Sequence, residues 1–418
     1  MRLLFVHQNF PGQYRYLARH YGAQTGHEVV AVGEKANVLR QRPQLPGVKL
    51  LGYEMPKTNG DRLSRAIARG RVIAAGAAKL YREGFRPDVI FTHLGWGEGL
   101  FLKDIFPEAR VLLYCEFFYR AHGADSGFDP EFPQSAQGML RLRVMNAPLL
   151  MSLDASDWGV ASTQWQRRQF PAEYLSRISV IHDGIDTDVV APGGERREDE
   201  LITYVARNLE PYRGFHVFMR AIPEIQRRRP KARIVIVGGD EVSYSPRLPP
   251  GQTYRERLRR ELDGKIDWSR VDMPGRIAYG DYLALLRKSA VHVYLTYPFV
   301  LSWSVLEAMA AGCVVVASRT PPVEEVIKDG DNGLLVDFFS PEQIAARIDE
   351  ALRDPMEHLR QRARETVVEK FDLKRVCLPA QLKLVDELLV QSSALHLPHG
   401  IAGQCIEKHD ALRVLEVR

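Results

Sequence analysis

YPFVLSWSVLEAMAAGC, residues 297–313, is apolar over most of its length and carries a single charge, Glu307. The stretch joins two β-type runs, residues 290–296 and 313–318. Ser302 is a residue type that caps helix N-termini, so the middle of the stretch is expected to be helical. A strand, a short helix and a second strand in succession indicate a parallel α/β sheet. Glu307 then lies about one turn inside the helix, in surroundings that otherwise resemble a core.

The same alternation of strands and helices extends in both directions from this stretch. Further strands are expected at residues 2–7, 27–32, 87–93, 109–116, 158–163, 178–184, 201–207 and 232–239. A segment rich in Gly, Pro and charge follows Asp183 and reads as a linker. The expected fold class is therefore α/β, with two Rossmann-like parallel α/β lobes facing across a cleft. The predicted divisions are 1–190 for the first lobe, 191–375 for the second, and 376–418 for a C-terminal helix and tail, which could cross back to the first lobe.

The overall composition is that of a soluble globular protein. The chain has 418 residues, 45% of them hydrophobic and 26% charged, and a net charge of +5 that permits acidic partners without selecting one. Its four cysteines are scattered and match neither a zinc site nor a disulfide framework, which favours a reducing compartment. Neither a signal peptide nor a transmembrane run is evident, so we expect a cytoplasmic location, with peripheral contact at the inner face of a membrane as a further interpretation.

Two arginines mark a candidate anion site in the second lobe. Arg207 closes a strand, and Arg213 with Gly214 stands directly before a helix. Ligands of open α/β sheets bind beyond the carboxyl ends of strands. Guanidinium groups and free N–H groups at a helix start both attract phosphate. The alternative is that both arginines are solvated loop charges.

Carboxylates and a histidine stand at comparable strand ends. Glu307 could accept hydrogen bonds from a sugar diol, or be a helix-surface carboxylate stabilised by the helix dipole. In the first lobe, Gly12 lies in the first βα loop, and Glu116 ends a strand. His93 and Glu98 are expected to be exposed on the cleft side as acceptor-binding groups, with structural hydrogen bonds as the alternative.

Two other features have plain interpretations beside functional ones. Asp186, Thr187 and Asp188 spell the D-x-D pattern of some metal-dependent transferases, but they lie in the linker and read as turn chemistry. Residues 64–84 are expected to form a helix rich in Arg and Ala, which is either an ordinary solvated helix or one that touches an anionic membrane.

Four segments together resemble the family-4 retaining glycosyltransferases of the GT-B fold. The resemblance extends from the first strand to about residue 390. The segments are VARNLEPYRG (205–214), VHVYLTYPFVLSWSVLEAMAAGCVVVAS (291–318), PPVEEVIKDGDNGLLVD (321–337) and HDGIDTDVVAP (182–192). The resemblance implies a nucleotide-diphosphate sugar held by the second lobe, an acceptor held by the first lobe, and transfer with retention. It implies neither a metal nor a cofactor other than the donor substrate.

The resemblance also assigns roles to individual residues. Arg207 and Arg213 would bind the diphosphate and stabilise the departing charge, and Glu307 would accept the ribose hydroxyls. The other donor-binding positions are Gly12, Arg276, Ile277, Phe299, Ser302, Trp303 and Ser304. UDP is expected before GDP because relatives use it often. The acceptor would be a hydroxyl of a saccharide, glycolipid or metabolite, in surface polysaccharide synthesis, and no nucleic acid is expected as a partner.

The chain departs from the family pattern at two positions. Phe299 stands where the family usually has a glutamate that contacts the donor sugar. Glu116 stands where the family often has a histidine, and it would take over that catalytic position. These departures leave room for a nucleotide-sugar-binding protein without transferase activity, and the shared architecture leaves room for an epimerase. A phosphorylase would need a pyridoxal-phosphate lysine, for which no sequence context is found.

Overall fold

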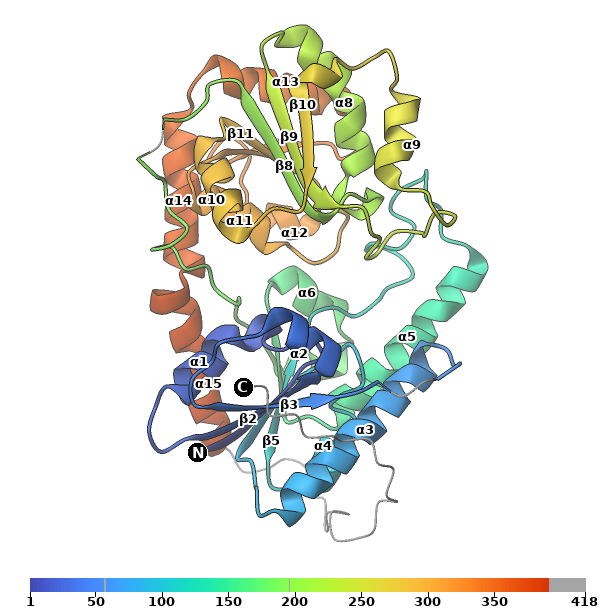
Figure 1. The fold of residues 1–418 in the computed structure, drawn as a ribbon, viewed down its shortest axis with the longest axis vertical. Coiled ribbons are helices and arrows are strands. Elements are labelled where there is room, and N and C mark those ends of the chain that lie inside the picture. Colours follow the sequence, from blue (N-terminus) through green and yellow to red (C-terminus); the bar gives the residue numbers. More distant parts are fainter. Residues whose placement is uncertain (56–57, 195, 391–418) are drawn as a thin grey trace. The chain divides into compact units, whose positions relative to one another are not determined.

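The computed structural model describes residues 1–55, 58–194 and 196–390, which divide into two units (Figure 1). Within the described chain, unit 1 is formed by residues 1–121, 134–183 and 377–390, and unit 2 by residues 122–133 and 184–376. The sequence-based division placed residues 122–133 and 184–190 in the first lobe, whereas both belong to unit 2. The C-terminal helix at 378–390 belongs to unit 1, while the tail 391–418 lies outside the described residues.

Unit 1 is built on a parallel sheet of seven strands in the order β3-β2-β1-β4-β5-β6-β7. The strands are β1 Arg2–Val6, β2 Glu28–Glu34, β3 Val48–Tyr53, β4 Val89–His93, β5 Arg110–Tyr114, β6 Trp158–Ala161 and β7 Ile178–Val180. In the central strand, Leu3 lies opposite Val29 on one side and Val89 on the other. The near-continuous apolar strands follow from burial of both faces of the sheet.

Helices cover both faces of this sheet. They are α1 Arg15–Gly22, α2 Lys35–Gln41, α3 Arg62–Arg82, α4 Leu102–Ile105, α5 Ala136–Asp154, α6 Gln164–Gln169, α7 Ala172–Leu175 and α15 Leu378–Val390, with the 3₁₀ turn η1 Gly12–Tyr14. Alternate residues of β1 enter two cores. Leu3 and Phe5 pack with α1 and α15, while Leu4 and Val6 pack with α3 and α4. The chain end at α15 thus completes the core of unit 1.

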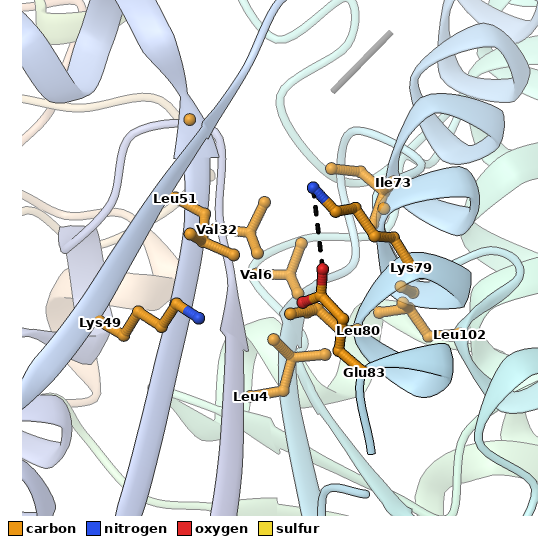
Figure 2. A pocket seen from close by; sticks show the side chains of 13 residues that line it. Leu4, Val6, Val32, Lys49, Leu51, Ile73, Lys79, Leu80, Glu83 and Leu102 are labelled. Atoms are coloured by element: carbon orange, nitrogen blue, oxygen red, sulfur yellow. Dashed lines mark ion pairs between the residues drawn. The ribbon is translucent and has the colours of Figure 1, made fainter. Parts of the chain in front are cut away.

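A cavity of ≈ 160 Å³ lies between α3 and the edge of the sheet (Figure 2). Its apolar walls come from β1, β2, β3, α3 and the first residue of α4. Gly76 and Ala77 line it where larger side chains would otherwise fill the space. Lys79 on α3 and Glu83 directly after that helix, which pair at 3.8 Å, lie at the margin of the cavity. The small residues of α3 therefore leave a void that the sheet does not fill.

Replacement of Gly76 by alanine is expected to stabilise unit 1 by about 1 kcal/mol. Alanine is the better helix former by that amount, and Gly76 lines a cavity that has room for a methyl group. The matched control is Gly70→Ala on the same helix, where a new Cβ would lie 2.7 Å from the carbonyl oxygen of Gly97. Urea unfolding of both variants should give midpoints on opposite sides of the wild type. A stabilised G70A variant would contradict this packing.

Unit 2 is built on a parallel sheet of six strands in the order β10-β9-β8-β11-β12-β13. The strands are β8 Leu201–Asn208, β9 Arg233–Gly239, β10 Val271–Gly275, β11 Val291–Tyr294, β12 Val314–Ser318 and β13 Leu334–Val336. The helices are α8 Phe215–Arg228, α9 Tyr254–Glu261, α10 Tyr279–Lys288, α11 Trp303–Ala310, α12 Pro321–Glu324, α13 Pro341–Arg353 and α14 Glu357–Phe371. Further short segments are the 3₁₀ turns η2 Pro211–Arg213 and η3 Trp268–Arg270 and the π-helical segment η4 Leu373–Cys377.

Residues 297–313 lie at the centre of unit 2. The strand that precedes them, β11, pairs with β8 on one side and β12 on the other. Ala308, Ala310 and Ala311 are buried, and α11 packs against β12 and α14. The small residues after Glu307 therefore let this helix approach its neighbours closely.

Residues 122–133 form a segment of unit 2 that the chain supplies from between β5 and α5 of unit 1. Asp129 is buried and accepts hydrogen bonds from His216 Nε2 at 2.9 Å and from the Tyr297 hydroxyl at 2.7 Å. Phe128 packs on Tyr297, and Phe132 packs edge-on against His216. We call residues 122–133 the strap.

Candidate functional site

Arg213 lies at a carboxyl-end loop of the sheet of unit 2. The turn η2 places it directly before α8, and Gly214 follows it with φ 68°. Its Nη1 donates to Thr296 Oγ1 at 2.9 Å and to the carbonyl oxygen of Val300 at 3.1 Å. The guanidinium is thus held against the loop that precedes α11, and none of the described residues takes up its Nε or Nη2 donors.

Arg207 lies close to the end of β8, where the pairing with β9 shifts register. Its side chain is exposed, and it makes no hydrogen bond or ion pair with any of the described residues. An exposed cation at a strand end attracts an anion without first breaking an existing pair. The two predicted arginines therefore differ: Arg213 is fixed in place and Arg207 is free to move.

The N-terminus of α11 is ordered by its own side chains. Ser302 is the cap and accepts a hydrogen bond from the N–H of Ser304 at 3.3 Å. The N–H of Ser302 donates to the hydroxyl of Tyr294 at 2.9 Å, and Arg213 Nη1 lies 3.4 Å from the same hydroxyl. Trp303 begins the helix and is 44% exposed. The helix start and Arg213 are thereby joined through one tyrosine, and both carry partial or full positive charge.

Glu307 lies one turn into α11 and contacts two tyrosines. Its carboxylate oxygens accept hydrogen bonds from the hydroxyls of Tyr279 at 2.7 Å and Tyr282 at 2.9 Å. Burial raises the pKa of Glu307, and these two hydrogen bonds partly oppose that shift. The carboxylate keeps spare lone pairs, since each oxygen can accept more than one hydrogen bond. It is therefore a half-buried, oriented acceptor of the kind that binds a diol.

Arg276 lies at an open hollow of ≈ 450 Å³ at the ends of β9 and β10. It donates to Asn208 Oδ1 at 2.8 Å and pairs with Glu241 at 2.6 Å. Gly239 lines the hollow, and a Cβ there would lie 2.7 Å from Arg276 Nε. Arg276 thus lines a space large enough for a ring system. Ile277, the other predicted position, is half-buried against the core and is not one of the residues that line this hollow.

Phe299 is buried in an aromatic cluster. Its ring centroid lies 4.9 Å from that of Tyr244 and 5.7 Å from that of Tyr212. Buried Glu210 fixes the loop that carries Tyr244, because one of its oxygens accepts hydrogen bonds from the N–H groups of residues 243–245 at 3.0 to 3.1 Å. The position that would hold a sugar-binding glutamate therefore holds a packed apolar ring.

In unit 1, Gly12 lies directly over His7. It has φ 49°, and a Cβ at this position would lie 2.6 Å from the imidazole. His7 Nδ1 accepts the N–H of Asn9 at 3.0 Å, so its Nε2 carries the proton. That buried Nε2 has no hydrogen-bond partner within the described chain. Burial lowers the pKa of His7.

His93 and Glu116 lie together at the ends of neighbouring strands. His93 Nδ1 accepts the N–H of Gly95 at 2.9 Å, which leaves Nε2 facing Glu116 at 3.5 Å. The imidazole stacks on Trp96 with a centroid distance of 3.9 Å. Contrary to expectation, His93 is buried, with a side-chain exposure of 1%, whereas Glu116 is 30% exposed. Glu116 is therefore the member of the pair that solvent reaches.

Glu98 does not have the exposure that the sequence analysis expected. It is fully buried, and Oε1 accepts the hydroxyl of Tyr53 at 2.6 Å. Burial raises its pKa. A carboxyl group enclosed in this way is a structural partner of Tyr53, because an incoming substrate would have to displace packed side chains to reach it.

Several residues that complete these arrangements were not identified from the sequence. They are His7, Trp96, Tyr279, Tyr282, Tyr294 and Thr296. The pair Tyr279 and Tyr282 had a usable signal, since residues three apart on a helix share a face. Contacts between distant strand ends, such as those of Tyr294 with Arg213, leave no comparable pattern in one sequence.

The D-x-D residues contact the C-terminal part of unit 2. Asp186 and Asp188 pair with Lys374 at 3.2 and 2.8 Å, and Thr187 donates a hydrogen bond to buried Asp372. Among the described residues, no three His, Cys, Asp or Glu side chains gather as a metal site would need. These contacts give the motif a structural role.

Two parallel α/β sheets, the second with a cationic loop and a helix start at its carboxyl ends, are the architecture of the GT-B glycosyltransferases. Residues 25–190 match the family described as glycosyl transferase family 4 group, and residues 188–367 match glycosyl transferases group 1. The two matches together span most of the chain, which therefore belongs to the group 1, family 4 glycosyltransferases. Members of this family are retaining hexosyltransferases that use nucleotide sugars.

Curated relatives at 26–29% identity are D-inositol 3-phosphate glycosyltransferases. That of Corynebacterium efficiens is 27% identical over 73% of this chain and 72% of its own length. That of Nocardiopsis dassonvillei is 29% identical over 47% of this chain, and the chain spans about half of its length (48%).

Solved structures share the fold at lower identity. Sucrose-phosphate synthase of Thermosynechococcus elongatus aligns with a TM-score of 0.71 and 19% identity over 94% of this chain and all of its own. A glycosyltransferase of Rickettsia africae aligns with a TM-score of 0.69 and 15% identity over 94% and 99%. HepE of Anabaena, solved with UDP and glucose, aligns with a TM-score of 0.65 and 16% identity over 92% and 99%.

Proposed function

We propose that this chain transfers a hexosyl-type sugar from UDP-sugar, with GDP-sugar as the next candidate, to a hydroxyl of a saccharide, glycolipid or metabolite. The observation that supports this most is that Arg213, the start of α11 and Glu307 lie in one unit: Tyr294 links Arg213 to the helix start, and Glu307 lies one turn further along the same helix. A diphosphate needs cations and N–H donors, and a ribose needs a carboxylate. Surface polysaccharide synthesis is the pathway we propose.

The residues that we propose to bind the donor also explain how the nucleoside diphosphate departs. Negative charge grows on the diphosphate as the glycosidic bond breaks, and Arg213, held at fixed geometry, stabilises that charge without reorganising. Arg207 adds a mobile cation, and the N–H groups at the start of α11 add a dipole. A phosphate oxygen of the donor takes the acceptor proton, so no separate side-chain base is needed.

Unit 1 would bind the acceptor and the reacting sugar face. Glu116, partly exposed beside His93, is the group we assign to hydroxyl contact. A side chain at position 12 would meet His7, so the loop needs glycine there, and we assign the backbone of this loop to contact with the donor. We assign no acceptor contact to Glu98, because its side chain is buried.

The donor's identity has two kinds of support. HepE of Anabaena was solved with UDP-glucose, which favours UDP and a hexose here. Phe299, packed between Tyr212 and Tyr244, cannot accept a hydrogen bond from a sugar hydroxyl. Because the Phe299 ring is buried, other groups must bind the hydroxyls of the donor sugar.

The experiment is a donor panel. UDP-, GDP- and dTDP-sugars are titrated by calorimetry, and nucleoside diphosphate release is followed with polyol, saccharide and glycolipid acceptors. Binding of a UDP-sugar with release that depends on the acceptor supports the proposal. Binding without turnover under every acceptor favours a nucleotide-sugar-binding protein, and failure of every donor to bind overturns the reading.

Glu307→Gln is expected to weaken UDP binding about tenfold, or about 1.4 kcal/mol. The amide keeps the size of the side chain but loses a charged acceptor for the ribose hydroxyls. Wild-type affinity should fall as the pH drops through the raised pKa of Glu307, because protonation removes the same acceptor. The variant should lose that pH dependence.

The control is Glu342→Gln, an exposed glutamate on α13 of the same unit. It should bind UDP as the wild type does at every pH. Equal affinities of E307Q and wild type for UDP would remove Glu307 from the ribose site.

A further inference from the structure

Helix α5 is apolar on two opposite sides. Leu142, Leu149 and Leu153 are buried against unit 1. On the far side, Leu140, Val144 and Met151 are 67%, 38% and 43% exposed. These three lie within about 40° of one another around the helix axis. An apolar stripe facing solvent is not explained by packing within the described chain.

This exposure is concentrated on one helix. Eleven large apolar side chains are exposed in the described part of the chain, and four of them, Leu140, Val144, Leu150 and Met151, are on α5. Single exposed apolar residues are normal, but a contiguous group marks an interaction surface. The stripe therefore requires an occupant.

Charge around the stripe selects the occupant. Arg141 and Arg143 are exposed and lie on either side of it, and Asp154 at the last position is the only acidic residue of α5. The neighbouring helix α3 adds exposed Arg65 and Arg71 (Figure 1). A second copy of this helix would bring arginines against arginines, whereas an anionic lipid surface meets both the stripe and its charges.

The sequence of α3 is compatible with an ordinary solvated helix or with contact to an anionic membrane. Some charged side chains of α3 already have partners within the chain. Arg69 donates to the carbonyl oxygen of Trp96 at 3.0 Å, and Lys79 pairs with Glu83. None of the exposed large apolar residues lies on α3. α3 therefore supplies charge beside the surface but no group that would insert.

We propose that α5 lies on an anionic lipid bilayer, with Leu140, Val144 and Met151 in the interfacial layer and Arg141 and Arg143 on lipid phosphates. This is peripheral binding, and no helix in the described ranges has the length and apolar character to span a bilayer. The inference does not depend on the donor chemistry, since α5 contributes nothing to the nucleotide-binding loops.

The test is co-sedimentation with vesicles, without nucleotide. Wild type should bind vesicles of phosphatidylcholine mixed with phosphatidylglycerol and not phosphatidylcholine alone. The triple variant L140S/V144S/M151S should bind at least tenfold more weakly, and R141Q and R143Q about fivefold each. High salt should weaken wild-type binding.

The matched control is L39S/R19Q, which removes an exposed leucine and arginine elsewhere on unit 1 and should bind as wild type does. Helical content and UDP titration of every variant check that folding is unchanged. Absence of binding to both vesicle types, or equal binding by the triple variant, overturns the proposal. So does a wild-type dimer in light scattering that the triple variant converts to monomer, because a second copy then covers the stripe.

Discussion

Arg213→Ala is expected to lower kcat/KM for sugar transfer at least tenfold, which is about 1.4 kcal/mol of transition-state stabilisation. Three acceptors, Thr296, Val300 and Tyr294, fix this guanidinium in place, so its charge is aimed before the diphosphate departs. Loss of a preorganised cation affects the transition state more than the bound donor. The drop should therefore appear in kcat as well as in UDP affinity, measured by initial rates over donor concentration.

A change of net charge alone must be separated from this effect. Arg227→Ala removes the same charge from an exposed site on α8, where the side chain pairs with Glu224. Its kinetics should equal those of the wild type. If R213A kept full activity, or if R227A lost as much, Arg213 would have no part in the mechanism.

Asp129→Ala is expected to destabilise unit 2 by roughly 3 kcal/mol, because two buried donors, His216 Nε2 and the Tyr297 hydroxyl, lose their common acceptor. Burial alone would raise the pKa of Asp129, but these hydrogen bonds outweigh burial and hold it below its usual range. A loss of this size lowers the melting temperature of a domain of this length by roughly 6–12 °C. Calorimetry measures the shift.

Two further variants, each with a smaller expected loss of stability, serve as comparisons for Asp129→Ala. Asp129→Asn keeps the shape and one acceptor oxygen, so its loss should be smaller. Glu131→Gln weakens a partly exposed ion pair of the same strap with Arg220 and should cost less than about 1 kcal/mol. Hydrogen exchange at residues 122–133 should rise in D129A and change little in E131Q. Equal stability of D129A and wild type would show that the strap contributes nothing to unit 2.

The pattern of apolar residues in the sequence was sufficient to predict most of the strands of the two sheets. Buried parallel strands are continuous apolar runs, so β1, β8, β9 and β12 were predicted within a residue or two. β3 was missed because its sequence, VKLLGY, has a lysine near its start, and its burial alternates at that end. An edge strand half covered by neighbours gives a weaker signal than a central one.

Side-chain environment was the harder part of the site. Arg207, Arg213 and Glu307 could be nominated because strand ends and helix starts can be read locally. The burial of Glu98 could not, since its partner Tyr53 comes from β3, 45 residues away. The strap was likewise beyond sequence reasoning, because Asp129 finds its partners 87 and 168 residues further along the chain.

The path of the strap bears on any attempt to divide this protein into halves. Unit 2 is encoded by two separated stretches, so a fragment of residues 184–376 alone would lack the phenylalanines that cover Tyr297 and His216. Such a fragment should expose apolar side chains and aggregate. A synthetic peptide of residues 122–133, added in trans, should restore its solubility. A gene cut at the obvious linker would therefore separate most of unit 2 from a piece of its own interior.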